Sequence, residues 1–159
     1  GEWAKSGKTN AELLDLLLEE AYFDLPGPKS TGRDLFNGTW LEQKLRLAPS
    51  VTEEDVQATL LQFTVNTIAT PIKNTTKAQE VYVCGGGANN NYLMNCLGDA
   101  LPEYEVATTS KLGIDPDWVE AIAFAWMASE TISGRRIDTT AFTGAKSPVI
   151  LGGIYQAGE

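Results

Sequence analysis

The sequence predicts an α/β protein whose strands pair in parallel. Two short runs rich in β-forming residues lie at 80–84 and 104–108, and an apolar segment with helical spacing lies between them at 90–101. A further helical pattern follows at 116–133. Strands that are connected through a helix pair in parallel as a rule, so this order indicates a strand–helix–strand–helix layer.

The part of the chain before residue 80 is predicted to be mainly helical. Thr52 precedes three acidic residues, which is typical of a helix start, and Pro71 is expected to end the same helix. Residues 1–8 are polar and contain glycine, so they predict a loop. From the spacing of the apolar residues we expect helices at 11–23, 40–46 and 53–70.

Local signals also delimit the last helix and the C-terminal segment. Asp115 followed by Pro116 is typical of an N-cap and a first helical residue, and Gly134 is typical of the position after a helix end. The run "VILGGIYQ" at 149–156 predicts a closing strand.

The composition argues against several classes of function. The 159 residues carry a net charge of −9, which disfavours binding to nucleic acid or to anionic membranes. There is no histidine, so the chain has no Ser-His or Cys-His pair and no histidine metal ligand. No apolar run reaches the roughly 18 residues of a membrane span, and no signal peptide is visible. Cys84 and Cys96 are too far apart for a CxxC motif, and we expect a reduced, cytoplasmic setting.

Near the N-terminus, Gly7, Lys8 and Thr9 resemble the end of a phosphate-binding P-loop. That motif has four residues between its glycines and follows a strand. Here five residues separate Gly1 from Gly7, and no strand pattern precedes them. The sequence therefore argues against a P-loop.

The strongest candidate site is the glycine run in "VYVCGGGANNNYLM", residues 81–94. Gly85, Gly86 and Gly87 follow a predicted strand and precede a predicted helix, where free backbone N–H groups bind phosphate. Glycines also let a ligand lie against the backbone without a Cβ in the way. Two interpretations stay open, a nucleotide site and a tight turn without a ligand. Asn89 and the two asparagines after it can cap the helix or hydrogen-bond a ligand.

Glu120 lies near the start of the predicted 116–133 helix, directly before the apolar run "AIAFAW". The helix dipole favours an acidic residue in the first turn, which explains this glutamate without a function. A carboxylate beside so apolar a run could instead face a binding site. Both interpretations stay open on the residues alone.

The predicted loop at 24–34 contains the cations Lys29 and Arg33 among small polar residues. Together with Ser30 and Thr31 they could bind an anion, because an arginine can donate two hydrogen bonds to one ligand. Solvated surface charge is the simpler interpretation of the same residues.

Four segments, taken together, resemble one bacterial family, the anhydro-N-acetylmuramic acid kinases. They are "PGPKSTGRDLFN", "VYVCGGGANNNYLM", "DPDWVEAIAFAWMA" and "TGAKSPVILGGIY", in this order. The resemblance covers nearly the whole chain and is to the C-terminal portion of the family. It implies the actin-like ATPase fold, related to ribonuclease H, that actin-like sugar kinases share with heat-shock ATPases. Residues 1–140 would form part of a C-terminal nucleotide-binding domain with inserted helices, and 141–159 a tail returning toward an N-terminal domain.

The resemblance also implies an activity, a carbohydrate kinase of peptidoglycan recycling. Enzymes of the family open the 1,6-anhydro bridge of anhydro-N-acetylmuramic acid with water and phosphorylate the freed 6-oxygen, which gives N-acetylmuramic acid 6-phosphate. ATP and Mg²⁺ are the implied cofactors. By the same resemblance, Gly85, Gly86, Gly87 and Asn89 contact the adenosine part of ATP, and Glu120 contacts the sugar.

A further implication is that this chain is a fragment. The catalytic aspartate and the first phosphate loop of the family lie in the N-terminal half, and the chain begins with Gly1 rather than Met. We therefore expect no catalytic residue and no turnover in this chain alone. The N-terminal half of the same protein would be its partner, and the family suggests a homodimer.

Two other functions stay open on the sequence. One is a nucleotide-binding regulatory or scaffolding module of the same superfamily. The other is an acidic α/β interaction domain in which the glycine turn is purely structural.

Overall fold

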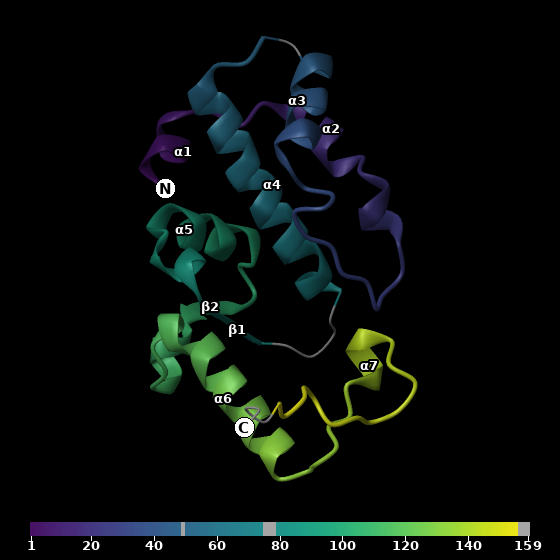
Figure 1. Cartoon of the computed structure of the whole chain (residues 1–159). Helices are drawn as coiled ribbons and strands as arrows, with labels where there is room; N and C mark the ends of the chain where they lie inside the picture. Colours follow the sequence, from purple (N-terminus) through teal and green to yellow (C-terminus); the bar gives the residue numbers. More distant parts are fainter. Residues whose placement is uncertain (49, 75–78, 156–159) are drawn as a thin grey trace.

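A computed structural model of the chain describes residues 1–48, 50–74 and 79–155. Figure 1 shows helices above and below a small sheet. The α-helices and strands, in chain order, are α1 (Glu2–Ser6), α2 (Ala11–Leu18), α3 (Gly38–Leu47), α4 (Glu53–Lys73), β1 (Glu80–Val83), α5 (Asn91–Ala100), β2 (Glu105–Thr108), α6 (Val119–Ile132) and α7 (Thr140–Thr143). Short 3₁₀ turns are η1 (Ala21–Asp24), η2 (Gly86–Asn89), η3 (Thr109–Leu112) and η4 (Pro116–Trp118).

Helix α4 is the centre of the helical part of the molecule. Helices α1, α2 and α5 all pack against it, and Figure 1 shows it running down the middle of that group. Each helix buries its apolar stripe in this packing. The core side chains are Ala4, Leu13, Leu17, Ala58, Thr59, Val65, Ala69, Ala88, Leu97 and Leu101.

Polar contacts fix the first turns of α4 to the segment between α1 and α2. The Thr59 hydroxyl is fully buried; it donates to the Asp55 carbonyl at 2.6 Å and accepts from the Asn10 amide at 2.9 Å. The Asp55 carboxylate accepts from the Lys8 amide at 2.7 Å. A Cβ at Gly7 would lie only 2.0 Å from the Glu54 carbonyl oxygen. Gly7 is therefore required by close packing of two backbones, which supports the rejection of a P-loop.

The prediction of a loop at residues 1–8 is wrong, because α1 forms there. A five-residue helix is not stable by itself, and no periodicity can indicate one so short. It forms because Ala4 is buried where α1 packs on α4. The helix expected at 11–23 also ends early, at Leu18, and continues after a break as the turn η1.

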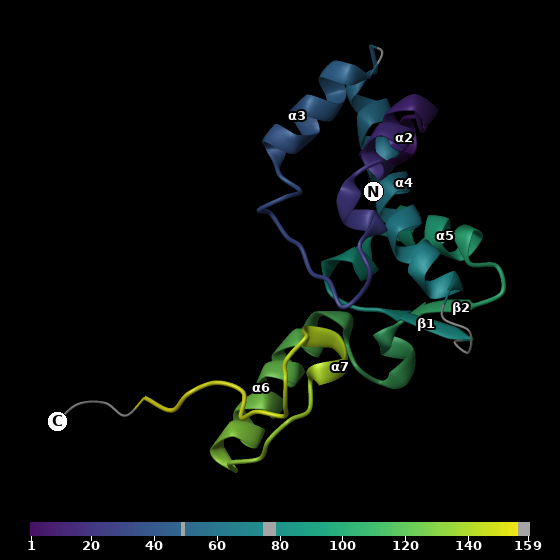
Figure 2. The same cartoon turned by 90° about the vertical axis from the view of Figure 1, so that its right-hand side faces the viewer.

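The α/β prediction with parallel strands is confirmed. Strands β1 and β2 pair in parallel, in a register that sets Val83 beside Thr108. Helix α5 connects them, and the Asn90 side chain caps it by accepting from the Leu93 amide at 3.0 Å. Figure 2 shows α4 and α5 on one side of the sheet and α6 and α7 on the other. The actin-like fold within the α/β class stays a prediction.

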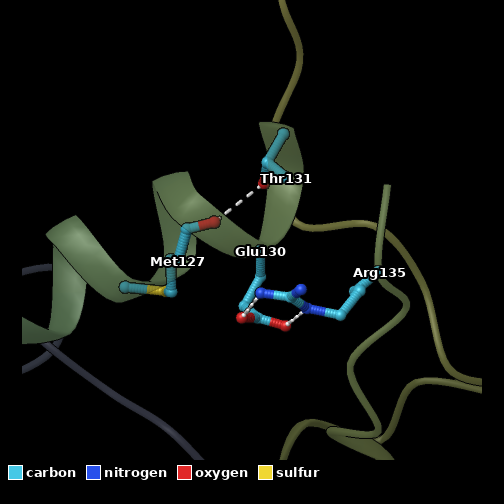
Figure 3. A network of polar contacts seen from close by, with 4 residues as sticks. All are labelled: Met127, Glu130, Thr131 and Arg135. Carbon is cyan, nitrogen blue, oxygen red and sulfur yellow. Dashed lines mark hydrogen bonds and ion pairs between the residues drawn. The ribbon is translucent and has the colours of Figure 1, made fainter. Parts of the chain in front are cut away.

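Helix α6 begins and ends close to the predicted residues. Asp115 caps the preceding turn η4, which starts at Pro116, and Gly134 follows the helix in the left-handed region at φ 66°. Figure 3 shows its C-terminal end, where Arg135 donates from Nε to the Glu130 carboxylate at 2.6 Å and the Thr131 hydroxyl donates to the Met127 carbonyl. The Thr131 hydroxyl also contacts the Leu151 carbonyl, so this end of α6 holds the segment that follows α7.

Pro71 does not end α4, contrary to the prediction. The helix continues for two residues beyond it, to Lys73. A proline lacks the amide donor and crowds the carbonyl four residues earlier, but it does not prevent the residues after it from being helical. With 21 residues α4 is long, but neither it nor another helix in the described part of the chain is apolar enough to cross a membrane.

The strand predicted at 149–156 is also wrong over its described residues, which end at 155. Val149 makes a single antiparallel bridge with Ile137, and no strand extends from it. Gly152 adopts φ 92°, outside the extended region, so β-prone side chains cannot continue a ladder there.

The Thr59 contacts lead to a first prediction. Replacing Thr59 with valine keeps the volume but leaves the half-buried Asn10 amide without its acceptor, so we expect a loss of about 1–3 kcal/mol in unfolding free energy. Urea unfolding followed by circular dichroism measures it. Thr64→Val is the matched control, because the Thr64 hydroxyl also donates to the carbonyl four residues earlier but is exposed. Equal effects of both variants would contradict the role given to Thr59.

The ion pair in Figure 3 gives a second prediction. Hydrogen bonds from Arg135 lower the pKa of Glu130 and outweigh the opposite effect of burial. A lowered pKa in the folded state means that the stabilisation is present at neutral pH and is lost as the pH falls through that pKa. The Tm difference between the unchanged chain and Glu130→Gln should therefore shrink from about pH 7 to about pH 3. Glu42→Gln, which breaks an exposed pair with Arg46, should show no such trend.

Candidate functional site

The carboxyl ends of β1 and β2 form one edge of the sheet, and the glycine turn starts there. Because the strands are parallel, the residues that follow Val83 and Thr108 leave the sheet side by side. Ligands of α/β proteins bind preferentially in the crevice at such an edge. The site predicted from the glycine run therefore lies where the fold favours a ligand.

Gly85 has a backbone conformation that residues other than glycine rarely adopt. Its φ is 72° and its ψ is −173°, a region occupied almost only by glycine. This conformation turns the chain from β1 into η2, and the Asn90 cap then starts α5. The first glycine of the run is thus explained by the turn itself, whether or not a ligand binds.

Gly86 is different, because nothing within the described chain requires a glycine there. Its φ is not positive, and a Cβ built on it would meet no atom within 4 Å. A Cβ on Gly87 would meet Leu93 at an ordinary 3.6 Å. Gly86 is also exposed. The absence of a side chain at this position therefore leaves open backbone, as a ligand lying against the turn would need.

The structure joins the glycine turn to the start of α6. The Gly85 amide donates to the Pro116 carbonyl at 2.9 Å, and the Asn89 side chain donates to the Asp117 carboxylate at 3.4 Å. Asp117 belongs to η4, directly before α6. Two segments that the sequence predicted as separate candidates thus lie next to each other.

Glu120 lies in the first turn of α6, close in sequence to these contacts. It is exposed, and its carboxylate makes no hydrogen bond or ion pair with any residue that the structure describes. Its position agrees with the helix dipole, and its carboxylate is also free to meet a ligand. The geometry fits both interpretations of this residue.

Thr109 is a further candidate at this edge that the sequence analysis missed. It follows β2 at the same edge, and its hydroxyl is the buried side-chain oxygen or nitrogen that lacks a hydrogen-bond partner among the described residues. Such a group is costly unless something outside the described chain pairs with it. Its place directly after a parallel strand was the only signal in the sequence.

The predicted anion loop lies away from this turn, against a cluster of aromatic rings. Lys29 donates to the carbonyls of Tyr22 and Phe23 at 2.8 and 2.9 Å and lies over the Tyr22 ring. Lys29 and Thr31 also line a pocket of about 630 Å³ beside these rings. Pro28 approaches Gly144, so the loop meets the segment after α7. The ammonium of Lys29 thus has a structural role.

The other loop residues, Ser30 and Arg33, are exposed, and contact of this loop with a ligand stays a prediction. Within residues 1–48, 50–74 and 79–155 no three Cys, Asp or Glu side chains are grouped so that they could hold a metal ion. The described residues therefore offer no ligand set to assign to Mg²⁺.

Comparison of the sequence with known protein families shows which family the chain belongs to. The family model described as anhydro-N-acetylmuramic acid kinase matches residues 1–157. The chain belongs to the anhydro-N-acetylmuramic acid kinase family. The family resemblance inferred from the four sequence segments is confirmed by this match.

Similar curated proteins carry the same name. Anhydro-N-acetylmuramic acid kinases of Shewanella sp. (strain ANA-3) and Shewanella putrefaciens (strain CN-32 / ATCC BAA-453) are each 50% identical to this family member over 157 residues. The match covers 99% of this chain but 42% of each relative, so the chain spans less than half of their length. Its predicted place in the C-terminal portion of the family stays a prediction.

Replacing Gly85 and replacing Gly86 should have different effects on the stability of the fold. Gly85→Ala forces a Cβ into a glycine-only conformation and should lower the unfolding free energy by about 1–3 kcal/mol. Gly86→Ala should change it by less than about 0.5 kcal/mol, because the added methyl meets open space. Denaturant unfolding of both variants measures this. A Gly86→Ala variant as unstable as Gly85→Ala would show that the turn is packed more tightly than described.

Proposed function

We propose that the protein to which this chain belongs is an ATP-dependent carbohydrate kinase of peptidoglycan recycling. It hydrolyses the 1,6-anhydro bridge of anhydro-N-acetylmuramic acid and phosphorylates the 6-oxygen to give N-acetylmuramic acid 6-phosphate. The observation that carries the proposal is family membership over residues 1–157. The open glycine turn joined to the helix of Glu120 supports it, since a kinase must hold two substrates next to each other.

The nucleotide would lie against the glycine turn. The exposed backbone at Gly86 leaves room for the adenosine part of ATP, and the adjacent Gly87 and Asn89 would contact it as the family resemblance implies. ATP supplies the phosphoryl group when it is bound. Mg²⁺ follows from the charge of the phosphates in such transfers, and the described residues of this chain are not assigned as its ligands.

The sugar would lie at the first turn of α6, where Glu120 would contact it through hydrogen bonds. In the reaction, a water oxygen bonds to the anomeric carbon while that carbon's bond to the bridging oxygen breaks. The freed 6-oxygen then accepts the γ-phosphoryl group, and ADP leaves. The general base that takes the water proton is assigned to the family's aspartate, outside this chain.

The finer features of the fold belong to the same proposal. We assign the chain to an actin-like ATPase fold, with residues 1–140 in a nucleotide-binding domain and 141–159 as a tail that returns toward another domain. The parallel pair β1–β2, with helices on both sides, is compatible with this assignment. A cytoplasmic location and a homodimer are proposed for the whole protein on the family resemblance.

A regulatory or scaffolding module that binds nucleotide is the second candidate. The glycine turn by itself would serve both functions equally well. Glu120 separates them, because a module that only binds nucleotide has no use for a carboxylate facing a sugar. An acidic interaction domain without any ligand would leave the open backbone at Gly86 without a reason.

The nucleotide assignment predicts a separation of binding from folding. Gly86→Val places a branched side chain on the open backbone and should weaken ATP binding about tenfold or more while Tm stays unchanged. Isothermal titration calorimetry on the complete protein measures it. Gly98→Val is the matched control, because Gly98 also has open space at its Cβ position but lies in α5. Unchanged ATP affinity in Gly86→Val would rule out the assignment.

The sugar assignment predicts the opposite selectivity. Glu120→Ala should raise the Kd for anhydro-N-acetylmuramic acid roughly ten- to hundredfold, because a hydrogen bond to a charged group is lost. Affinity for ATP should change little. Glu103→Ala, which removes another exposed carboxylate, serves as control. Equal loss of sugar and ATP binding, or loss of neither, would count against the role of Glu120.

A further inference from the structure

Helix α6 has apolar side chains on almost all of its sides. Phe124 and Trp126 are two residues apart and therefore point about 200° apart around the helix axis. Its charged residues are two glutamates, and it contains neither lysine nor arginine. A helix that is apolar all round belongs in a protein interior.

The structure leaves this helix largely uncovered. None of the α6 residues is buried, although the segment that follows α7 contacts Thr131 and lines a shared pocket with Phe124 and Ile132. Val119 and Met127 of α6 are half-buried. Four other large apolar residues of α6, with Trp118 just before it, form the α6 surface and are half or more exposed: Trp118 63%, Ile122 50%, Phe124 62%, Trp126 51% and Ile132 76%.

The sheet beside α6 is also small, with two described strands. In the described part of the chain, β1 and β2 each pair with the other strand alone. Parallel sheets occur almost only in larger sheets with both faces covered by helices. A two-stranded parallel sheet next to an uncovered apolar helix therefore indicates missing layers rather than a finished surface.

The length of the relatives points to what covers this surface. The matched segment is 42% of the relatives' length, so more than half of each relative lies outside it. A second copy of this chain would cover one side of α6 across a two-fold axis, whereas Phe124 and Trp126 need cover on opposite sides. Further layers of the same polypeptide can enclose a helix from several directions.

We propose that the α6 surface is an internal interface, covered by the part of the same polypeptide that lies outside the matched segment. The occupant is thus intramolecular, and contact with it does not depend on protein concentration. This proposal rests on the exposed residues and on the length of the relatives, and it requires neither ATP nor the sugar.

Hydroxyl-radical footprinting with mass spectrometry tests the interface on the complete protein, in its folded form and in a form unfolded by denaturant. We expect Phe124 and Trp126 to oxidise severalfold more slowly in the folded form, and this protection to persist on dilution. Protection that disappears on dilution would identify a second copy as the occupant and overturn the proposal. Equal oxidation in the two forms would overturn it as well. Neither outcome bears on kinase activity, which is assayed separately.

A matched pair of variants gives an independent measurement. Ile122→Glu places a carboxylate in the α6 surface, and Leu47→Glu places one on an exposed leucine at the end of α3. In the complete protein Leu47→Glu should leave Tm nearly unchanged, because that site is exposed. In the same protein Ile122→Glu should lower Tm by roughly 5 °C or more, because a carboxylate is buried without a partner. If the complete protein tolerates Ile122→Glu as well as Leu47→Glu, the α6 surface is not covered.

Discussion

Packing on one long helix organises the helical part of this molecule. Helix α4 offers buried positions along its length, and α1, α2 and α5 each cover one part of it. The contacts of Thr59 and Asp55 fix its first turns to the segment between α1 and α2. Helix α5 connects the two strands, so the position of α4 also sets where the sheet and its functional edge lie.

The glycine turn links this scaffold to the second group of elements. One backbone hydrogen bond, from Gly85 to the carbonyl of Pro116, connects the end of β1 with the start of α6. The same contact brings Asn89 and Asp117 together. Because the two substrates of a kinase must lie close together, a short, rigid connection between these segments suits the proposed function.

The exposed α6 surface and the proposed sugar site lie next to each other on the same helix. Glu120 and Phe124 are four residues apart and therefore lie on neighbouring parts of the same side of α6. A polypeptide that covers Phe124 would also pass close to Glu120, so the sugar site would be completed by the segment that completes the core. This explains in physical terms why an exposed, unpaired carboxylate can stand beside so apolar a helix.

The sequence by itself determined the local elements and the family. Strand and helix periodicity fixed β1, α5, β2 and α6, and the Asp115 and Gly134 signals delimited η4 and α6, because these features depend on neighbouring residues only. The four sequence segments also indicated the family, because each is a continuous run of residues that can be compared without knowing the fold. Only the tertiary structure decided the rest. Helix α1 forms because α4 buries Ala4. Within the described residues up to 155, no strand extends from Val149, because Gly152 leaves the extended conformation. The link from Gly85 to Pro116, and the Thr109 hydroxyl that has no partner among the described residues, depend on residues far apart in the chain. No local pattern can report such features.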